Sequence, residues 1–139
     1  MADNSLLLAK YIQQILEESE EIKAIIGEDT HKIFTVLQPD KLSFPYIVHG
    51  RSGISVEYTK DIEYGNIGWY NTVTYNVYSV SDDYEQCLDL ANAIRHSLET
   101  YRWKTEEIYI HPIQLLTVSE YTTEEDAFVE ELQFQCVVE

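Results

Sequence analysis

The sequence predicts a single α+β domain over residues 1–139, in which a mostly antiparallel sheet of five or six strands packs against two main helices. Apolar residues recur at helical spacing near the N-terminus and again over 82–101, whereas 70–80 and 127–139 alternate between apolar and polar residues. Short turn-like stretches join neighbouring strand segments, which implies antiparallel pairing. A chain of 139 residues, 45% of them hydrophobic, is long enough to bury one core.

The N-terminal segment is predicted to be helical. Asn4 or Ser5 can cap its first turn, because their side chains can accept hydrogen bonds from free backbone N–H groups. The glutamate-rich stretch around Ser19 favours a bend, and Gly27 is a typical C-terminal stop. The apolar residues at helical spacing are Leu8, Ile12, Ile15, Leu16, Ile22, Ile25 and Ile26.

Extended segments occupy the middle of the chain. A short apolar segment, 32–37, precedes a strand at 44–50 that a proline opens. Residues 54–59 are either a further strand or the continuation of 44–50 past a β-bulge near Gly53. The glycine-rich stretch 61–69 is a hairpin connection or a loop. Residues 70–80 form the clearest strand, with Val73, Tyr75 and Val77 on one face.

A helix and a β-rich last third complete the prediction. Asp82, with Glu85 three residues on, has the spacing of a capping box. Two short runs over 107–121, divided by Pro112, predict a kink or an edge strand. The turn at 122–126 joins them to 127–139 as a hairpin. The apolar stripe of the helix is Cys87, Ala91, Ile94, Leu98 and Tyr101, and the apolar face of the last strand is Phe128, Leu132, Phe134, Cys136 and Val138.

Composition excludes some function classes. Twenty-five acidic against nine basic residues give a formal net charge of −16, which argues against duplex DNA binding through phosphates, since that requires clustered Lys and Arg. The charge is consistent with a solvated surface, an acidic channel wall or a basic partner; mimicry of nucleic acid is the weakest reading, because the acids show no phosphate-like periodicity. No apolar run approaches the ~20 residues needed to cross a membrane. The N-terminus lacks the features of a signal peptide, so we expect synthesis in the cytoplasm.

The spacing of residues in the sequence matches no catalytic or ligand-binding motif. The sequence contains no phosphate loop, dinucleotide fingerprint or nucleophile elbow. The histidines His31, His49, His96 and His111 lack metal-ligand spacing, although folding of the sheet could bring His49 and His111 together. We therefore expect no catalytic residue, metal or cofactor.

Acidic neighbours and cysteines also have structural interpretations. Adjacent acids such as Asp82–Asp83 and Glu124–Glu125 would point to opposite faces of a strand, so they cannot share a substrate. Cys87 and Cys136 lie on apolar faces of a helix and a strand, and we expect both to be buried core residues.

Four aromatic and apolar residues are candidates for a contact surface. Tyr58, Tyr64, Ile67 and Trp69 cluster beside glycines in what should be an exposed connection. Exposed apolar residues of this kind mark interaction sites, and Tyr and Trp are favoured interface anchors. The alternative is a loop that folds back on its own core.

The order of these signals resembles a known family. The matching segments are IKAIIGEDTHKIF (22–34), FPYIV (44–48), TYNVYSVSDDYEQCLDLANAIRHSL (74–98) and EYTTEEDAFVEELQFQCVV (120–138). Together they resemble the small tail-completion or tail-terminator proteins of tailed bacteriophages and prophages. The sequence departs from the family pattern in its longer, aromatic-rich segment at 57–70.

The resemblance implies a structural role in virion assembly. Such proteins form rings, often hexameric, that cap the tail tube and join it to the DNA-filled head. The implied partners are further copies of this chain, the tail tube and the head–tail connector proteins. DNA would pass through an acidic lumen without specific binding. The implied location is the host cytoplasm during assembly and then the head–tail junction of the virion.

Two other readings remain open from the residues alone. One is an acidic adaptor that binds a basic protein partner. The other is an enzyme or small-molecule-binding protein with an unrecognised pocket, for which a deep pocket with a strongly shifted ionisable group would be evidence.

Overall fold

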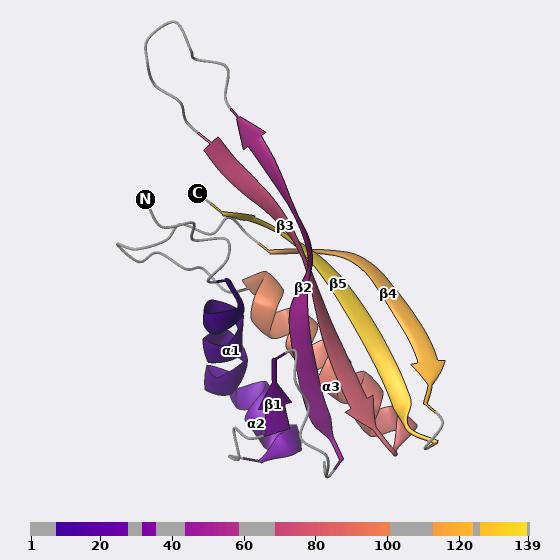
Figure 1. The fold of residues 1–139 in the computed structure, drawn as a ribbon. Helices are drawn as coiled ribbons and strands as arrows, with labels where there is room; N and C mark the ends of the chain where they lie inside the picture. The colour runs from indigo at the N-terminus through magenta and orange to yellow at the C-terminus, as the bar shows by residue number, and fades with distance from the viewer. Residues whose placement is uncertain are drawn as a thin grey trace, which may run out of the picture.

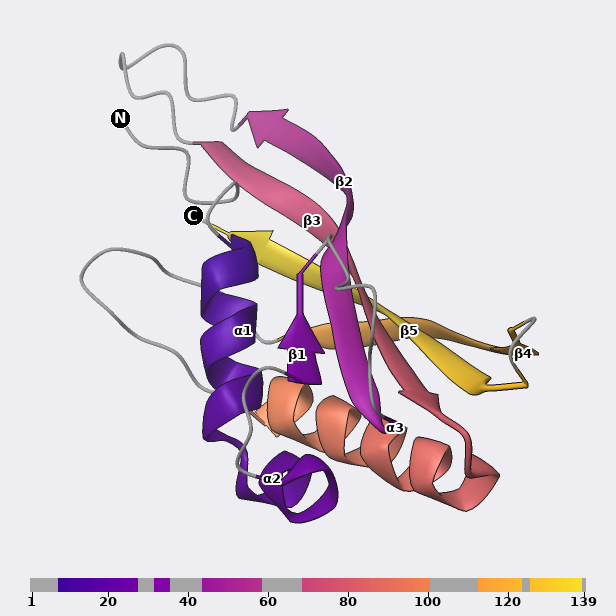
Figure 2. The ribbon, with the colours of Figure 1, turned by 60° about the horizontal axis from the view of Figure 1, so that its bottom comes forward.

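A computed structural model describes residues 8–27, 32–35, 44–58, 69–100, 113–123 and 126–138. The order of elements is α1 (Leu8–Glu18), α2 (Glu20–Ile26), β1 (Ile33–Phe34), β2 (Tyr46–Tyr58), β3 (Trp69–Ser81), α3 (Tyr84–Thr100), β4 (Gln114–Thr122) and β5 (Phe128–Val138). Five strands form one sheet in the order β1-β2-β3-β5-β4, and the helices lie on one side of it (Figures 1 and 2). The predicted α+β class is confirmed.

The N-terminal helical segment is interrupted where the sequence predicted a bend. Ser19 separates α1 from α2, and its hydroxyl accepts a hydrogen bond from the Ile22 amide at 3.4 Å. The same hydroxyl is 2.6 Å from that of Ser97, which attaches the junction to α3. Gly27 ends α2 with φ at 85°, a backbone conformation that favours glycine.

All but one of the strand pairs are antiparallel. β2 pairs with β3 from Tyr46–Val80 to Tyr58–Trp69, and β3 and β4 both pair with β5 in the same sense. The short strand β1 is the exception, because it runs parallel to β2. Residues 35–45 separate these two strands in the sequence, which is more than a hairpin turn contains, so the short-turn argument for antiparallel pairing does not apply to them.

The two uncertain strand predictions are resolved. β2 is one strand, and the register shift between Arg51 and Gly53 is the β-bulge that was one of the two alternatives for this region. β4 is the edge strand predicted for the run after Pro112, which itself lies outside the described residues. In the β4–β5 turn, Asp126 has φ at 60°, and the Thr123 amide donates to the Ala127 carbonyl at 2.9 Å.

The core lies between the helices and the face of the sheet that they cover. α3 contacts β3 and β5, and α1 contacts α3, β1 and β2. The predicted stripe of α3 is buried as far as Leu98, and Tyr101 lies outside the described residues. The sheet supplies Ile47, Val73, Tyr75, Val77, Leu132, Phe134 and Cys136, which follow the predicted alternation.

The predicted cap of α3 is wrong by one residue. The Glu85 amide donates to Oδ1 of Asp83 at 3.1 Å, and the Cys87 amide donates to the Asp83 carbonyl at 2.9 Å, so Asp83 and not Asp82 is the N-cap. The shift occurs because β3 extends to Ser81, whose hydroxyl accepts from the Asp83 amide at 3.1 Å.

The corrected cap predicts unequal effects of two neighbouring substitutions. Asp83→Ala should lower the free energy of unfolding by about 1 kcal/mol, because the Glu85 amide loses its acceptor. Asp82→Ala removes the same charge without that bond and should change it by less than about 0.5 kcal/mol. Urea denaturation of both variants measures the difference, and an equal loss in both would contradict the assignment.

Candidate assembly surfaces

The predicted contact residues lie at the end of the β2–β3 hairpin. Tyr58 is the last residue of β2 and pairs with Trp69, the first residue of β3. Tyr64 and Ile67 lie outside the described residues, as do the side chains of Tyr58 and Trp69. The structure therefore places two of the four predicted residues side by side in the backbone of one hairpin.

This end of the hairpin extends past the neighbouring strand. The last pair between β3 and β5 joins Asn71 to Val138, whereas β2 and β3 continue together to Tyr58–Trp69. Figure 1 shows these strand ends running beyond the helices. We call residues 57–58 and 69–70 the hairpin arm. A two-stranded ribbon alone is only marginally stable in water, so such an arm gains stability from contact with another surface.

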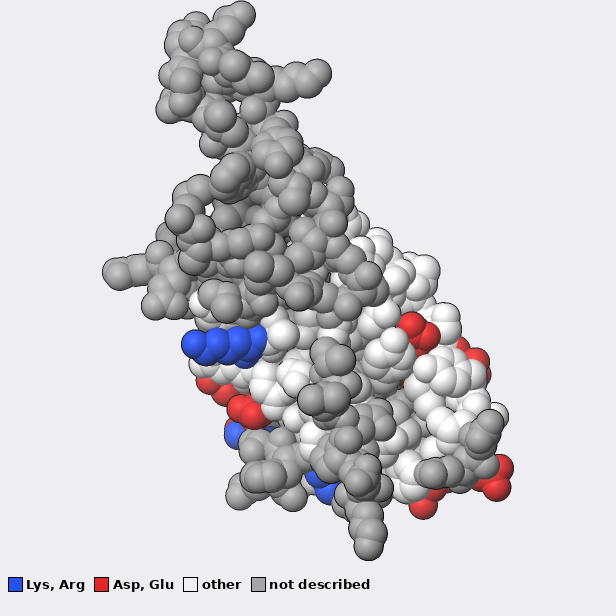
Figure 3. Space-filling view, viewed as in Figure 1, with Lys and Arg blue, Asp and Glu red and all other residues white. Residues whose placement is uncertain are grey.

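The face of the sheet opposite the helices is a second candidate surface. No described helix lies on it, and uncharged atoms predominate where Figure 3 shows it. Phe44, Tyr46 and Tyr78 are partly exposed there and pack on a small buried cluster of Val80, Ala127 and Val129. The Phe44 and Tyr46 rings stack with their centroids 5.7 Å apart. We call this surface the open face.

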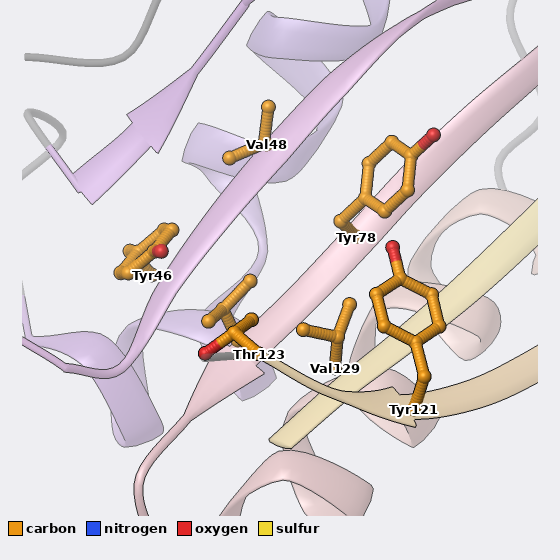
Figure 4. Close-up of a pocket in the computed structure, with 7 residues that line it drawn as sticks. Tyr46, Val48, Tyr78, Tyr121, Thr123 and Val129 are labelled. Carbon is orange, nitrogen blue, oxygen red and sulfur yellow. The ribbon is translucent and has the colours of Figure 1, made fainter. Parts of the chain in front are cut away.

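A shallow hollow of about 360 Å³ lies on the open face (Figure 4). Its lining residues come from β2, β3, β4, β5 and the β4–β5 turn: Tyr46, Val48, Tyr78, Val80, Tyr121, Thr123 and Val129. Beside it, the Tyr78 hydroxyl donates to Glu131 at 3.3 Å. The hollow offers apolar walls and tyrosine hydroxyls, but no carboxylate, histidine or thiol from the described residues lines it.

The buried histidine has a structural role. His49 is 2.6 Å from both the Gln13 side-chain oxygen, through Nε2, and the Tyr75 hydroxyl, through Nδ1. The amide oxygen can only accept, so Nε2 carries the proton and Nδ1 accepts from Tyr75. Burial lowers the pKa of His49 to about 4, which keeps the ring neutral.

The other histidines do not add to a site in the described structure. His96 is exposed, and its Nδ1 is 2.6 Å from a Glu21 carboxylate oxygen. His31 and His111 lie outside the described residues, so the predicted approach of His111 to His49 is untested. Among the described residues, no three His, Cys, Asp or Glu side chains are placed to bind a metal ion.

Both cysteines are buried thiols, as predicted. The Cys87 thiol donates to the carbonyls of Ser79 at 3.2 Å and Phe128 at 3.4 Å. Burial raises the pKa of Cys87 and raises that of Cys136 to about 12. Thiols that stay protonated are weak nucleophiles, so these residues serve the core.

A pair of carboxylic acids on the covered side of the sheet was not predicted. Glu120 on β4 pairs across the strands with Glu130 on β5, and the two carboxyl groups lie close enough to shift each other's pKa. The Tyr84 hydroxyl, at the start of α3, also interacts with Glu120, which raises the pKa of Tyr84 and lowers the pKa of Glu120. We call Tyr84, Glu120 and Glu130 the acid pair site.

The two acids have opposite pKa shifts. Burial, together with the Glu120 carboxylate, raises the pKa of Glu130 to about 7. Hydrogen bonds from Tyr84 and Glu130 lower the pKa of Glu120. Glu130 is therefore the acid that keeps its proton to the higher pH, and Glu120 is the acid that ionises first. The signal was present in the sequence, because Glu130 falls on the same face of its strand as Leu132, Phe134 and Cys136.

Of the two acid pairs named in the sequence, only Asp82–Asp83 can be judged in the described structure, and it does not form such a site. Asp83 caps α3, and Asp82 is exposed beside it. Glu124 and Glu125 lie outside the described residues. None of the described helices is both long enough and apolar enough to span a membrane.

Comparisons with known proteins identify the family to which the chain belongs. A family model described as "Tail completion protein gp17" matches residues 10–139. A solved structure titled "Virion of native gene transfer agent (GTA) particle" has a chain with a similar fold, at a TM-score of 0.72 and 16% sequence identity. That match covers 91% of this chain and 90% of the other. A search of curated proteins found no match. Because the family model spans nearly all of its length, the chain belongs to the phage tail-completion protein gp17 family.

Proposed function

We propose that this phage structural protein is a ring-forming tail terminator, which closes the tail tube and joins it to the head. The observation that carries the proposal is the family match over residues 10–139. The similar fold of a chain in a gene transfer agent particle supports it. In this proposal the chain is made in the host cytoplasm and then resides at the head–tail junction.

A closed ring requires two different patches that meet around the axis. The hairpin arm is the first patch, because its strands extend past β5 and it carries Tyr58 and Trp69. Tyr64 and Ile67, which follow in the same connection, remain part of the proposed interface. The open face of the next copy is the second patch, because its partly exposed Tyr46, Val48 and Tyr78 complement an aromatic arm.

The net charge suits a channel for DNA. A lumen with excess negative charge would repel phosphates within a Debye length, about 8 Å at physiological salt. The genome could then slide through the ring without binding to it. The charge of −16 also predicts that ring formation is favoured by added salt, because salt screens the repulsion between copies.

Native mass measured by light scattering tests ring formation. We expect a closed species whose population grows with salt and protein concentration and which appears as a ring in negative-stain images. The same preparation should not retain duplex DNA at low salt. If the protein alone is monomeric, the measurement is repeated with tail tubes from particles that lack it. Absence of a ring in both settings would overturn the proposal.

A pair of variants locates the interface. Tyr58→Ser with Trp69→Ser should abolish the ring and leave a folded monomer. Leu88→Ser is the matched control, because Leu88 is an exposed apolar residue on α3, away from both the arm and the open face. Rings that survive the double substitution would show that the arm is not an interface.

An adaptor for a basic partner is a second candidate, and the acid pair site is the observation that favours it. The small-molecule or enzyme alternative has less support. Tyr121 lines the shallow hollow on the open face, and burial raises the pKa of its hydroxyl, so this group stays protonated and does not serve as a base or nucleophile.

A further inference from the structure

We propose that the acid pair site binds a lysine or arginine side chain from an extended basic segment of a partner protein. The segment would lie along the free edge of β4 and place its cation against Glu120 and Glu130. This interaction is separate from ring formation, since it uses neither the hairpin arm nor the open face.

The first support is an incompletely satisfied buried carboxyl group. Only 4% of Glu130 is exposed to solvent. One of its carboxyl oxygens, Oε1, has no hydrogen-bond partner among the described residues. A buried acceptor without a partner is costly, and a cation is the ligand that would satisfy both acids at once. No lysine or arginine in the described part of the chain forms an ion pair with either acid.

The second support is the apolar surface around these acids. Leu88 lies one helical turn beyond Tyr84 on α3 and is 40% exposed. Val118 lies two residues before Glu120, on the same face of β4, and is 51% exposed. Lysine and arginine bury the methylene part of their side chains on apolar surface while the charged end reaches a carboxylate. Charge and shape therefore both suit a long basic side chain.

The third support is the unpaired edge of β4. β4 is the last strand of the sheet, so among the described strands its outer side has no partner for its backbone N–H and C=O groups. An extended peptide can add to such an edge through main-chain hydrogen bonds. Alternate side chains of the added strand would then face the acid pair site.

Docking would release a proton at neutral pH. In the free protein Glu130 shares its proton with Glu120, and the other titratable groups near it are Tyr84 and Cys87 on α3. A cation beside both carboxyl groups would favour their ionised forms. Binding should therefore strengthen as the pH rises from about 6 to about 8.

A synthetic peptide provides the test. The probe is a short peptide of alternating lysine and valine with blocked termini, and its counterpart has glutamate in place of lysine. We expect the lysine peptide to bind in calorimetry and to shift the amide NMR signals of β4. Calorimetry in buffers of different ionisation enthalpy should show release of a proton. The glutamate peptide should not bind.

Matched variants distinguish binding at the acid pair site from attraction of the peptide to the overall negative charge. Glu120→Gln with Glu130→Gln should weaken binding of the lysine peptide by about tenfold or more. Glu18→Gln with Glu20→Gln removes the same number of carboxyl groups, and at least as much charge, from exposed positions on α1 and α2, and should leave affinity within about twofold. Glutamine preserves the shape of each side chain, and a thermal melt confirms that each variant folds.

Three results would overturn the proposal. Equal binding by both double variants would mean that only net charge matters. Saturating shifts at the acid pair site from Mg²⁺ alone, which also block the peptide, would identify a simple cation site. A dimer that forms without peptide and dissociates in the Glu120→Gln and Glu130→Gln variant would identify a second copy as the occupant.

Discussion

Replacing Phe134 by alanine should lower the free energy of unfolding by about 3–5 kcal/mol. The Phe134 side chain is fully buried, and β5 lies between β3 and β4, so the surrounding strands cannot collapse into the space that the ring leaves. The total stability of a domain this size is typically about 5–15 kcal/mol, so the variant should be close to unfolding at 37 °C. Urea denaturation followed by tryptophan fluorescence measures the loss.

A second apolar residue on the neighbouring strand is the control. Leu116 is 47% exposed at the bulge of β4, and Leu116→Ala should change stability by less than about 0.5 kcal/mol. A loss below about 1 kcal/mol for Phe134→Ala would mean that the helices do not pack on this face as described. A large loss for Leu116→Ala would show that the edge of β4 is covered in solution.

Regular elements were predictable where one face of an element is buried along its whole length. The alternation of Val73, Tyr75 and Val77 fixed the orientation of β3, because a one-residue slip would expose all three. The stripe through Cys87, Ala91 and Ile94 fixed that of α3 in the same way. In both cases buried residues recur with the period of the backbone, so several residues indicate the same orientation.

Features set by one residue or by distant pairing were not predictable. The cap of α3 could be either Asp82 or Asp83 by chemistry, and only the length of β3 decides between them. The parallel pairing of β1 depends on which strand lies beside it in space. The apposition of Glu120 and Glu130 depends on the β4–β5 register, although an acid on the apolar face of β5 is a local sign of it.

Of the two candidate assembly surfaces, the hairpin arm was predicted from the sequence and the open face was not. Tyr58 and Trp69 were singled out because aromatic residues beside glycines are unusual in an exposed connection, and the structure places both in one hairpin. The open face was missed because its partly buried residues, such as Tyr46, Val48 and Tyr78, alternate with the core residues of the same strands. Sequence alternation shows two faces but not which face the helices cover.

Glu130→Gln should stabilise the protein at about pH 8 by about 1–3 kcal/mol. The carboxyl pKa is 4.5 in the unfolded chain and about 7 in the folded protein. The folded state therefore holds an extra proton between these values, and the stabilising contribution of Glu130 is present below pH 4.5 and lost as the pH rises through 7. Glutamine retains the polar shape and cannot ionise, so this loss disappears.

His49 makes the free energy of unfolding depend on pH in the opposite direction. Its pKa falls from 6.5 in the unfolded chain to about 4 in the folded protein, so stability is lost as the pH falls through that range. Between pH 4.5 and 6.5 the two slopes nearly cancel in the native protein. Removing the Glu130 carboxyl should leave the His49 slope alone, so that the variant gains stability from about pH 4 to about pH 6.5 and then levels off.

Urea denaturation at a series of pH values compares this variant with the native protein and with Glu18→Gln, which removes the same charge from an exposed position. Plotted against pH, the free energies of unfolding of the native protein and of Glu18→Gln should run parallel. The free energy of unfolding of Glu130→Gln should rise above both as the pH increases. The two acids would not share a proton if the curves of Glu130→Gln and Glu18→Gln coincided. Because the acid pair site would then be ionised without a partner, that outcome would also remove the basis for proton release on docking of a basic segment.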